Sequence, residues 1–404
     1  MRYRIKWGLV LLPALALAMP AFAPAPAYAA RDINLSDSQE PGSVLVFPEF
    51  IKNGAVNVDG VPLPRTEIEI GMVCPPGVTP TTTLCFEHQP FKLRGDWVCP
   101  GLETFESKAI CQNTSFEVDI TLDGKIAFPA DGGNYFSNQP HVQAPQCKNG
   151  YLIVWVVNNA GDKISFNGLI GDAVLRGPNN AVGSGSVNPG FSTAVSAYPA
   201  IPIQSPKPIN TILNASGKDE LSFAGDDYQE VTGVLIGDVK FDNDTPRASG
   251  GPTPINAFSE TFLIFMTLDV LSGHSNPPVF VPITFWNETK AGAPSTDPNF
   301  ENPTDTAVHF ICWGRFQLTA IDDNLTQLNQ GTRKGLFITD QATFGASPFV
   351  SDDEHAPGTD ATLLGLVHTV EGTPGNSFQE RSYIFVPYND SDPVPTEFEA
   401  VEND

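Results

Sequence analysis

Residues 150–176 read GYLIVWVVNNAGDKISFNGLIGDAVLR, and this stretch decides the fold class. Residues 151–157 are apolar on both alternating phases, a pattern typical of a β-strand that is covered on both faces. Residues 158–162 have turn chemistry, because Asn and Gly accept left-handed backbone angles. Residues 164–175 then return as a second strand. The stretch therefore predicts a central hairpin whose Trp155 belongs to the core and not to an active site.

Short strands are expected along the rest of the chain as well. Residues 66–72 and 115–122 alternate between apolar and polar side chains, which indicates strands with one buried face. In the second run, Phe116 and Val118 are expected to point inward. Further strands are expected at 43–47, where Pro48 ends the strand, and at 125–128, 228–241, 261–271, 279–286, 307–320, 335–339, 361–370 and 381–388. Pro282 predicts an edge position or a bulge, because proline cannot donate a backbone hydrogen bond.

Turn residues and short strands together define the fold class. The chain contains 37 Pro and 35 Gly, and no run with helical period follows residue 29. Many short strands joined by turns predict an all-β protein with two antiparallel β-sandwich domains, immunoglobulin-like or jelly-roll-like. The first domain is expected at 30–210 and contains an irregular excursion at 74–111. The second is expected at 211–395, followed by an acidic tail at 396–404.

The beginning of the chain carries an export signal. Arg2, Arg4 and Lys6 precede an apolar run, and Ala27 and Ala29 flank Tyr28 in a small-x-small cleavage pattern. Residues 1–29 are therefore expected to be removed, and the mature chain to lie outside the cytoplasm, in the periplasm or in the extracellular space. No stretch is long and apolar enough to predict a transmembrane helix. The net charge of −24 argues against binding to nucleic acid or anionic lipid.

Several strand and turn strings resemble a group of exported bacterial β-rich proteins of unknown function. The strings that carry the resemblance are residues 42–48 (GSVLVFP), 150–156, 169–174 (LIGDAV), 200–204 (AIPIQ), 268–270, 324–326 and 331–335 (GTRKG). The resemblance spans roughly residues 42–395. It implies a bacterial source and an extracytoplasmic β-rich fold. It implies no activity, ligand or catalytic residue.

Six cysteines in an exported chain predict disulfide bonds. At least two bonds are expected among the five cysteines of the first half, Cys74, Cys85, Cys99, Cys111 and Cys147. Six cysteines allow 15 connectivities, and pairing between neighbours, Cys74 with Cys85 and Cys99 with Cys111, is the one favoured. Cys312 shares the phase of apolar residues in its strand and is expected to be a buried free thiol.

No pattern in the sequence predicts a catalytic, cofactor-binding or metal site. Most of the six histidines are expected on the surface or in loops, since none lies in a nucleophile elbow or at zinc-ligand spacing. Loop carboxylates could hold calcium through their oxygen atoms, but none completes a calcium-binding spacing. The carboxylate clusters are at 226–227, 242–244, 322–324 and 352–354.

These observations favour a non-catalytic structural or binding protein of the periplasm or cell surface. Self-association and a cell-surface partner are the two expected kinds of interaction. The alternative is a secreted hydrolase that acts on a glycan, which would require two carboxylates facing each other across a cleft. An enzyme is thus disfavoured but not excluded by the sequence.

Overall fold

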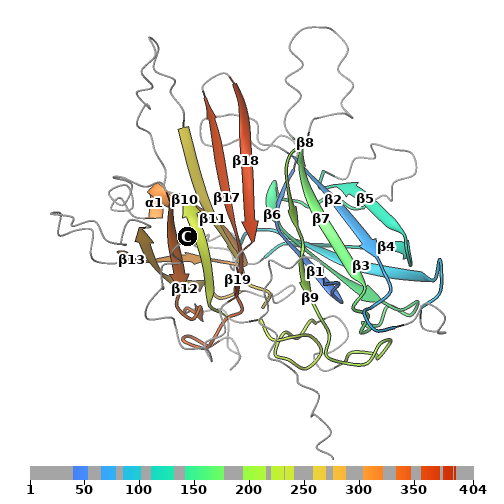
Figure 1. The fold of residues 1–404 in the computed structure, drawn as a ribbon. Helices are drawn as coiled ribbons and strands as arrows, with labels where there is room; N and C mark the ends of the chain where they lie inside the picture. The colour runs from blue at the N-terminus through green and yellow to red at the C-terminus, as the bar shows by residue number, and fades with distance from the viewer. Residues whose placement is uncertain are drawn as a thin grey trace, which may run out of the picture. The chain divides into compact units, whose positions relative to one another are not determined.

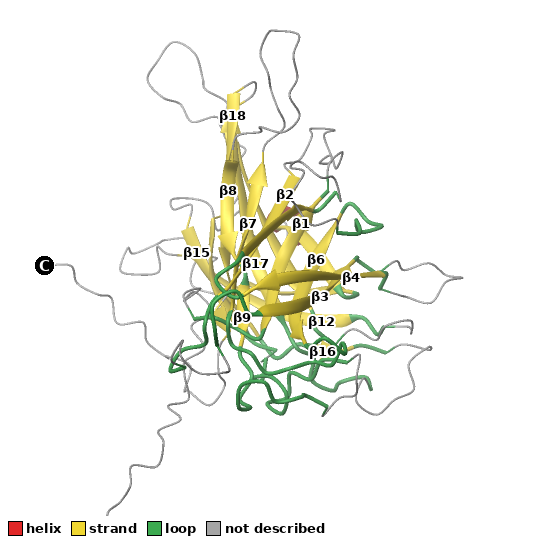
Figure 2. Ribbon diagram, turned by 90° about the vertical axis from the view of Figure 1, so that its right-hand side faces the viewer, coloured by secondary structure: helices red, strands yellow, loops and turns green. Residues whose placement is uncertain are grey.

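The computed structural model of the chain consists almost entirely of strands and loops where it is described (Figures 1 and 2). The described residues are 40–52, 65–78, 85–101, 111–131, 142–176, 194–214, 220–231, 233–240, 258–269, 276–287, 304–321, 334–346, 356–373, 376–384 and 386–387. The expected signal at 1–29 and acidic tail at 396–404 lie outside these residues.

Two antiparallel sheets form the N-terminal half of the described chain. The first has the strand order β4-β3-β6-β1-β9 and the second β5-β2-β7-β8. The strands are β1 (Val44–Ile51), β2 (Arg65–Met72), β3 (Pro90–Val98), β4 (Asn113–Thr121), β5 (Lys125–Pro129), β6 (Asn149–Val157), β7 (Leu169–Arg176), β8 (Ala194–Pro199) and β9 (Ile201–Ile203). Aromatic rings join the two sheets: Phe128 of β5 lies 6.1 Å from Trp97 of β3 and 5.6 Å from Phe116 of β4, between ring centroids.

Two further antiparallel sheets form the C-terminal half. One has the order β13-β12-β15-β10-β19, with β16 also paired to β12, and the other β14-β11-β17-β18. The elements are β10 (Leu235–Lys240), β11 (Phe258–Met266), β12 (Val279–Asn287), β13 (Thr304–Phe310), β14 (Trp313–Gln317), α1 (Leu318–Ile321), β15 (Lys334–Thr339), β16 (Thr343–Phe344), β17 (Leu364–Thr373), β18 (Asn376–Ile384) and β19 (Val386–Pro387). The rings of Phe265 in β11 and Phe310 in β13 stack across the sheets at 6.4 Å.

This arrangement confirms an all-β fold of antiparallel sheets, with two sheet pairs consistent with sandwiches. The division at residue 210 into two domains stays a prediction, because residues 34–404 form one unit in the pattern of backbone contacts. Edge strands β8 and β18, which belong to different halves, also lie against each other.

Strand β6 is central and buried, as expected, but the predicted hairpin is wrong. Residues 150–157 are all buried, and Trp155 is 3% exposed. The neighbours of β6 are β1 and β3, whereas β7 pairs with β2 and β8 in the other sheet. After the turn at residues 158–162, the chain pairs with β6 only as far as Ile164, whose amide donates to the carbonyl of Val156. The chain then crosses to the second sheet.

Strand β1 continues through Pro48, so the prediction that Pro48 ends it is wrong. The register between β1 and β6 shifts between Phe47 and Phe50. This irregularity is a β-bulge, which accommodates the missing amide of proline and changes the direction of the following side chain. Glu49 is consequently buried, together with Phe50 beside it.

The expected irregular excursion at 74–111 contains the regular strand β3. Phe91, Leu93 and Trp97 are buried on one face of this strand, which pairs with β4 on one side and β6 on the other. The alternation was hidden in the sequence because Gly95 replaces an apolar residue. Gly95 has no side chain, and a Cβ there would meet the Phe116 ring at 2.5 Å.

Pro282 lies inside a sheet, so the expected edge position is wrong, but the register changes by one residue beside it, an irregularity of the kind that the alternative expectation of a bulge described. Strand β12 pairs with β13 on one side and with β15 and β16 on the other. The second side has a gap between Phe280, which pairs with β16, and Ile283, which pairs with β15. The carbonyl of Pro282 faces this gap and accepts a hydrogen bond from the amide of Asp340 at 3.0 Å.

The strand expected at 307–320 is two strands separated by a tight turn. Cys312 has φ of 65°, which breaks the extended backbone between β13 and β14. The amide of Trp313 donates to the carbonyl of Ile311 at 2.7 Å and closes the turn. The turn brings Trp313 and Arg315 toward the N-terminal half.

Candidate functional site

A cluster of ionisable side chains lies where the two halves meet, and we call Glu49, Arg315 and His368 the junction cluster. Glu49 comes from the bulge of β1, Arg315 from β14 and His368 from β17. The side chains of Glu49 and His368 are 0% exposed and that of Arg315 is 14% exposed. Buried ionisable groups of this kind are candidates for functional residues.

The carboxylate of Glu49 lies between the two basic groups. His368 Nδ1 is 2.8 Å from Oε2, and Arg315 Nε is 3.5 Å from Oε1. Arg315 Nη2 is also 3.4 Å from His368 Nδ1. Because a guanidinium can only donate, we assign the Nδ1 hydrogen to a bond with Glu49. The guanidinium carbon lies 3.9 Å from the centre of the Phe262 ring, a cation–π distance.

The two basic neighbours decide the ionisation of Glu49. Burial alone would raise the pKa of this carboxyl, because a charge is costly away from water. His368 and then Arg315 outweigh burial, and they hold the pKa of Glu49 below its ordinary value of 4.5. The carboxylate is therefore ionised, and its contacts connect β1 to β14 and β17 of the C-terminal half.

Further bonds join the two halves around the junction cluster. Trp313 Nε1 donates to the carbonyl of Pro48 at 2.9 Å, directly beside Glu49. The Tyr151 hydroxyl donates to the carbonyl of Thr267 at 2.9 Å. The amide of Gly101 donates to the carbonyl of Ile311 at 3.0 Å.

Within the N-terminal half, Tyr198 secures the backbone that carries Glu49. Its hydroxyl donates to the carbonyl of Glu49, and the residue is 1% exposed. Burial and then the Glu49 carboxylate raise the pKa of this tyrosine well above 10. The hydroxyl therefore stays protonated and keeps donating, so the bulge is held from the N-terminal half as well as through its side chain.

Three disulfide bonds are present, and they correct part of the sequence analysis. Cys74 bonds to Cys85, the neighbour pairing considered above. The expected bond between Cys99 and Cys111 is wrong: Cys99 bonds to Cys147, and Cys111 to Cys312. The expectation of a free Cys312 thiol is therefore wrong too. The turn at Cys312 brings its Cα within 6.2 Å of that of Cys111, although 201 residues separate them.

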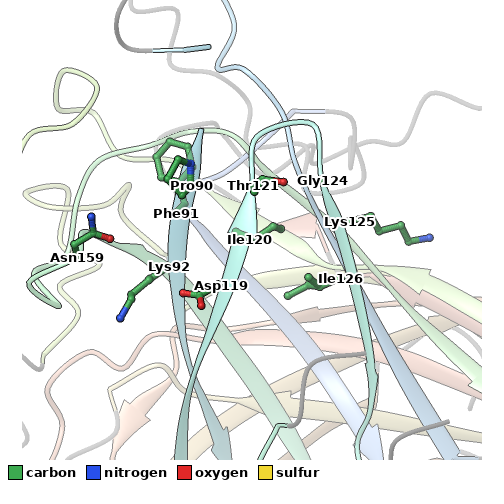
Figure 3. Close-up of a pocket in the computed structure, with 10 residues that line it drawn as sticks. All are labelled: Pro90, Phe91, Lys92, Asp119, Ile120, Thr121, Gly124, Lys125, Ile126 and Asn159. Carbon is green, nitrogen blue, oxygen red and sulfur yellow. The ribbon is translucent and has the colours of Figure 1, made fainter. Parts of the chain in front are cut away.

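A surface recess of about 430 Å³, which we call the edge pocket, lies beside the turn that connects β4 to β5 (Figure 3). Its lining residues are Pro90, Phe91, Lys92, Asp119, Ile120, Thr121, Gly124, Lys125, Ile126 and Asn159. Lys92 and Asp119 are opposite each other in the register of β3 and β4, while Lys125 forms an ion pair with Glu69. Asp119 is the one carboxylate in this lining, so the pocket lacks the facing pair that glycoside hydrolysis uses.

Few of the candidate residues from the sequence lie in the junction cluster or in the edge pocket. His88 and His309 are exposed, as expected for most of the histidines, whereas His368 is buried in β17 and is an exception. His141, His274 and His355 lie outside the described residues. The same is true of the carboxylates at 242–244, 322–324 and 352–354.

Sequence reasoning missed the junction cluster, although Glu49 carried a signal. A carboxylate inside the apolar run of residues 43–51 is unusual unless it is paired. Its partners could not be identified, because they come from strands that are remote in sequence. Among the described residues, no group of three or more His, Cys, Asp or Glu side chains is placed to hold a metal ion.

Comparisons with known proteins add no family. No protein-family model matches the chain, and no curated protein matches it. Among solved structures, a viral chemokine-binding protein, R17 from the rodent gammaherpesvirus Peru, aligns over 86% of this chain and 89% of its own, with 10% identity and a TM-score of 0.10. A similarity this low carries no argument about fold or function. Within the described part of the chain, no helix has the length and hydrophobicity that crossing a membrane requires.

Proposed function

We propose that this protein is an exported, non-catalytic structural or binding protein that acts in the periplasm or at the cell surface. The observation that carries the proposal is the use of the junction cluster. Glu49 and His368, which could serve acid–base chemistry, are fully buried and hold two halves of the chain together. A substrate cannot reach side chains in this position, so their role is mechanical.

Three disulfide bonds support the extracytoplasmic part of the proposal. Disulfides persist in oxidising compartments and are rare where thiols are kept reduced. The bond between Cys111 and Cys312 adds a covalent link between the halves beside the ionic one. A chain reinforced in both ways is suited to holding a shape outside the cell, where chaperones that use ATP are absent.

The proposal is tested by locating the protein and identifying its neighbours. Cells of the native host are treated with an alkylating reagent and separated into cytoplasmic, periplasmic, surface and medium fractions. We expect an oxidised chain outside the cytoplasm, with no free thiol to alkylate. Chemical cross-linking before lysis should yield adducts, either with further copies of the chain or with a surface component.

A glycan hydrolysis assay tests the alternative function, that of a secreted hydrolase. The purified chain is incubated with cell-wall and capsular glycans, with a Glu49→Gln variant measured in parallel. We expect no released sugar from either protein. Hydrolysis by the wild type, or a reduced chain in the cytoplasm, would overturn the proposal.

A further inference from the structure

A second buried pair of charged groups joins Lys163, in the connection between β6 and β7, to Asp227, in the connection between β9 and β10. Their side chains are 1% and 2% exposed, and Lys163 Nζ is 3.5 Å from Asp227 Oδ2. Nζ also donates to the carbonyl oxygen of Glu220. Removing two ions from water costs several kcal/mol for each ion, so a buried pair is stable only with close and well-oriented contacts.

The backbone on both sides of this pair is fixed. Lys163 forms a bridge with Val157, and its carbonyl accepts the amide of Leu213 at 2.9 Å. The carbonyl of Asp227 accepts the hydroxyl of Ser205 at 2.7 Å. Leu213 and Ser205 belong to the same described segment, 194–214. The two side chains are therefore brought together by ordered backbone, which is the condition for an efficient reaction between bound groups.

Aromatic side chains flank Asp227 in the sequence, and the Asp227 side chain itself is 2% exposed. The rings of Phe223 and Tyr228 stack at 5.6 Å, and Tyr228 is 0% exposed. The Tyr228 hydroxyl has no hydrogen-bond partner among the described residues. Burial and then the Asp227 carboxylate raise the pKa of Tyr228, so this group remains a neutral donor.

We propose that Lys163 and Asp227 condense to form an intramolecular amide bond between Nζ and Cγ. The reaction requires that a proton pass from Nζ to Oδ2, which leaves a neutral amine and a neutral carboxylic acid. The Nζ lone pair forms the new bond to Cγ. The bond from Cγ to the protonated oxygen breaks, and that oxygen departs with one amine hydrogen as water. No atom changes oxidation state, and no co-reactant is consumed.

The condensation removes two buried charges and joins distant parts of the chain. The amide is neutral, so the cost of burying an ammonium and a carboxylate disappears. The new bond links the connection between β6 and β7 to a segment 64 residues further along. The amide bond would form during maturation of the chain. It does not rest on the proposed function, because the bond can be measured on protein from any compartment.

Intact-mass measurement of the folded, purified chain tests the bond directly. Disulfides are first reduced, and each protein is compared with the mass expected from its own sequence. We expect the wild type to be lighter by one water, about 18 Da. Fragmentation should place the loss in a branched peptide that contains both Lys163 and Asp227.

Two variants serve as controls. Lys163→Arg keeps the positive charge but removes the nucleophilic amine, and Asp227→Ala removes the carboxyl group. Both should have their full sequence mass. If a variant does not fold, the wild-type mass and peptide map alone decide. A wild type at its full mass, or a water loss that persists in Asp227→Ala, would overturn the proposal and leave the export experiment unaffected.

Discussion

Replacing Glu49 by Gln tests whether the junction cluster holds the two halves together. The change keeps the shape of the side chain and removes its charge. His368 and Arg315 would then remain next to each other, with Nδ1 and Nη2 3.4 Å apart and no carboxylate between them. The variant therefore leaves buried basic groups without their counter-ion, which is the costly way to break a buried ion pair.

The size of the effect follows from the geometry. Glu49 lies 2.8 Å from His368 and 3.5 Å from the charged Arg315, and its side chain is fully buried. Removing one partner from such a pair costs about 3–5 kcal/mol. This is a large share of the roughly 5–15 kcal/mol that stabilises a typical folded protein. We expect Glu49→Gln to lower the free energy of unfolding by that amount at neutral pH.

The pH dependence of the effect has a definite sign. The pKa of Glu49 lies below 4.5 in the folded chain, so the folded state keeps the carboxylate ionised where the unfolded state takes up a proton. The stabilisation is complete above pH 4.5 and is lost as pH falls through the lowered pKa. Glu49→Gln should remove this part of the acid sensitivity and be closest to the wild type at low pH.

Urea unfolding with intact disulfides, followed by tryptophan fluorescence from pH 3 to 7, measures both effects. Glu87→Gln is the matched control, because Glu87 contacts His88 at 3.5 Å while the two side chains are 82% and 75% exposed. The control should change stability by less than about 0.5 kcal/mol. A loss below about 1 kcal/mol for Glu49→Gln would refute the account of the junction cluster.

Three further predictions concern the core, the disulfides and processing. Trp155→Ala should lower the free energy of unfolding by about 3–5 kcal/mol, measured by urea unfolding, whereas Asp162→Ser in the turn should change it little; an unchanged Trp155→Ala would show that Trp155 is not a core residue. Cys111→Ser should leave one free thiol, at Cys312, which is 1% exposed and is therefore alkylated only after the unreduced chain is denatured; labelling at Cys99 instead would contradict the pairing. N-terminal sequencing of the exported protein should begin at Ala30, and an intact Met1 on that protein would exclude cleavage.

Strand positions could be predicted where the periodicity is local. Residues 115–122 alternate without interruption, and the structure confirms Phe116 and Val118 as buried and Glu117 as exposed. In β3 the same alternation exists, but Gly95 and the flanking charges conceal it. Periodicity thus predicts which face of a strand is buried only when apolar side chains occupy that face.

The partners of each strand could not be predicted, because pairing depends on contacts between remote segments. The sequence shows that both faces of β6 are buried, but nothing near residue 150 indicates that β1 and β3 are its neighbours. The junction cluster is the same case, since Glu49 meets residues of β14 and β17. The partner of Cys111 was missed because the turn at Cys312 depends on a left-handed residue that is not glycine.

The pairing of Cys111 with Cys312 also constrains the order in which the chain matures. If cysteines were oxidised as they left a translocation channel from the N-terminus onward, Cys99 would meet Cys111 long before Cys147 or Cys312 emerged. The native bonds of Cys99 and Cys111 span 48 and 201 residues. Sequential oxidation would thus trap a wrong crosslink, which only thiol–disulfide exchange can resolve. On that sequential route, the native pairing would require a disulfide isomerase, or a Cys111 thiol that stays reduced until the last strands have arrived.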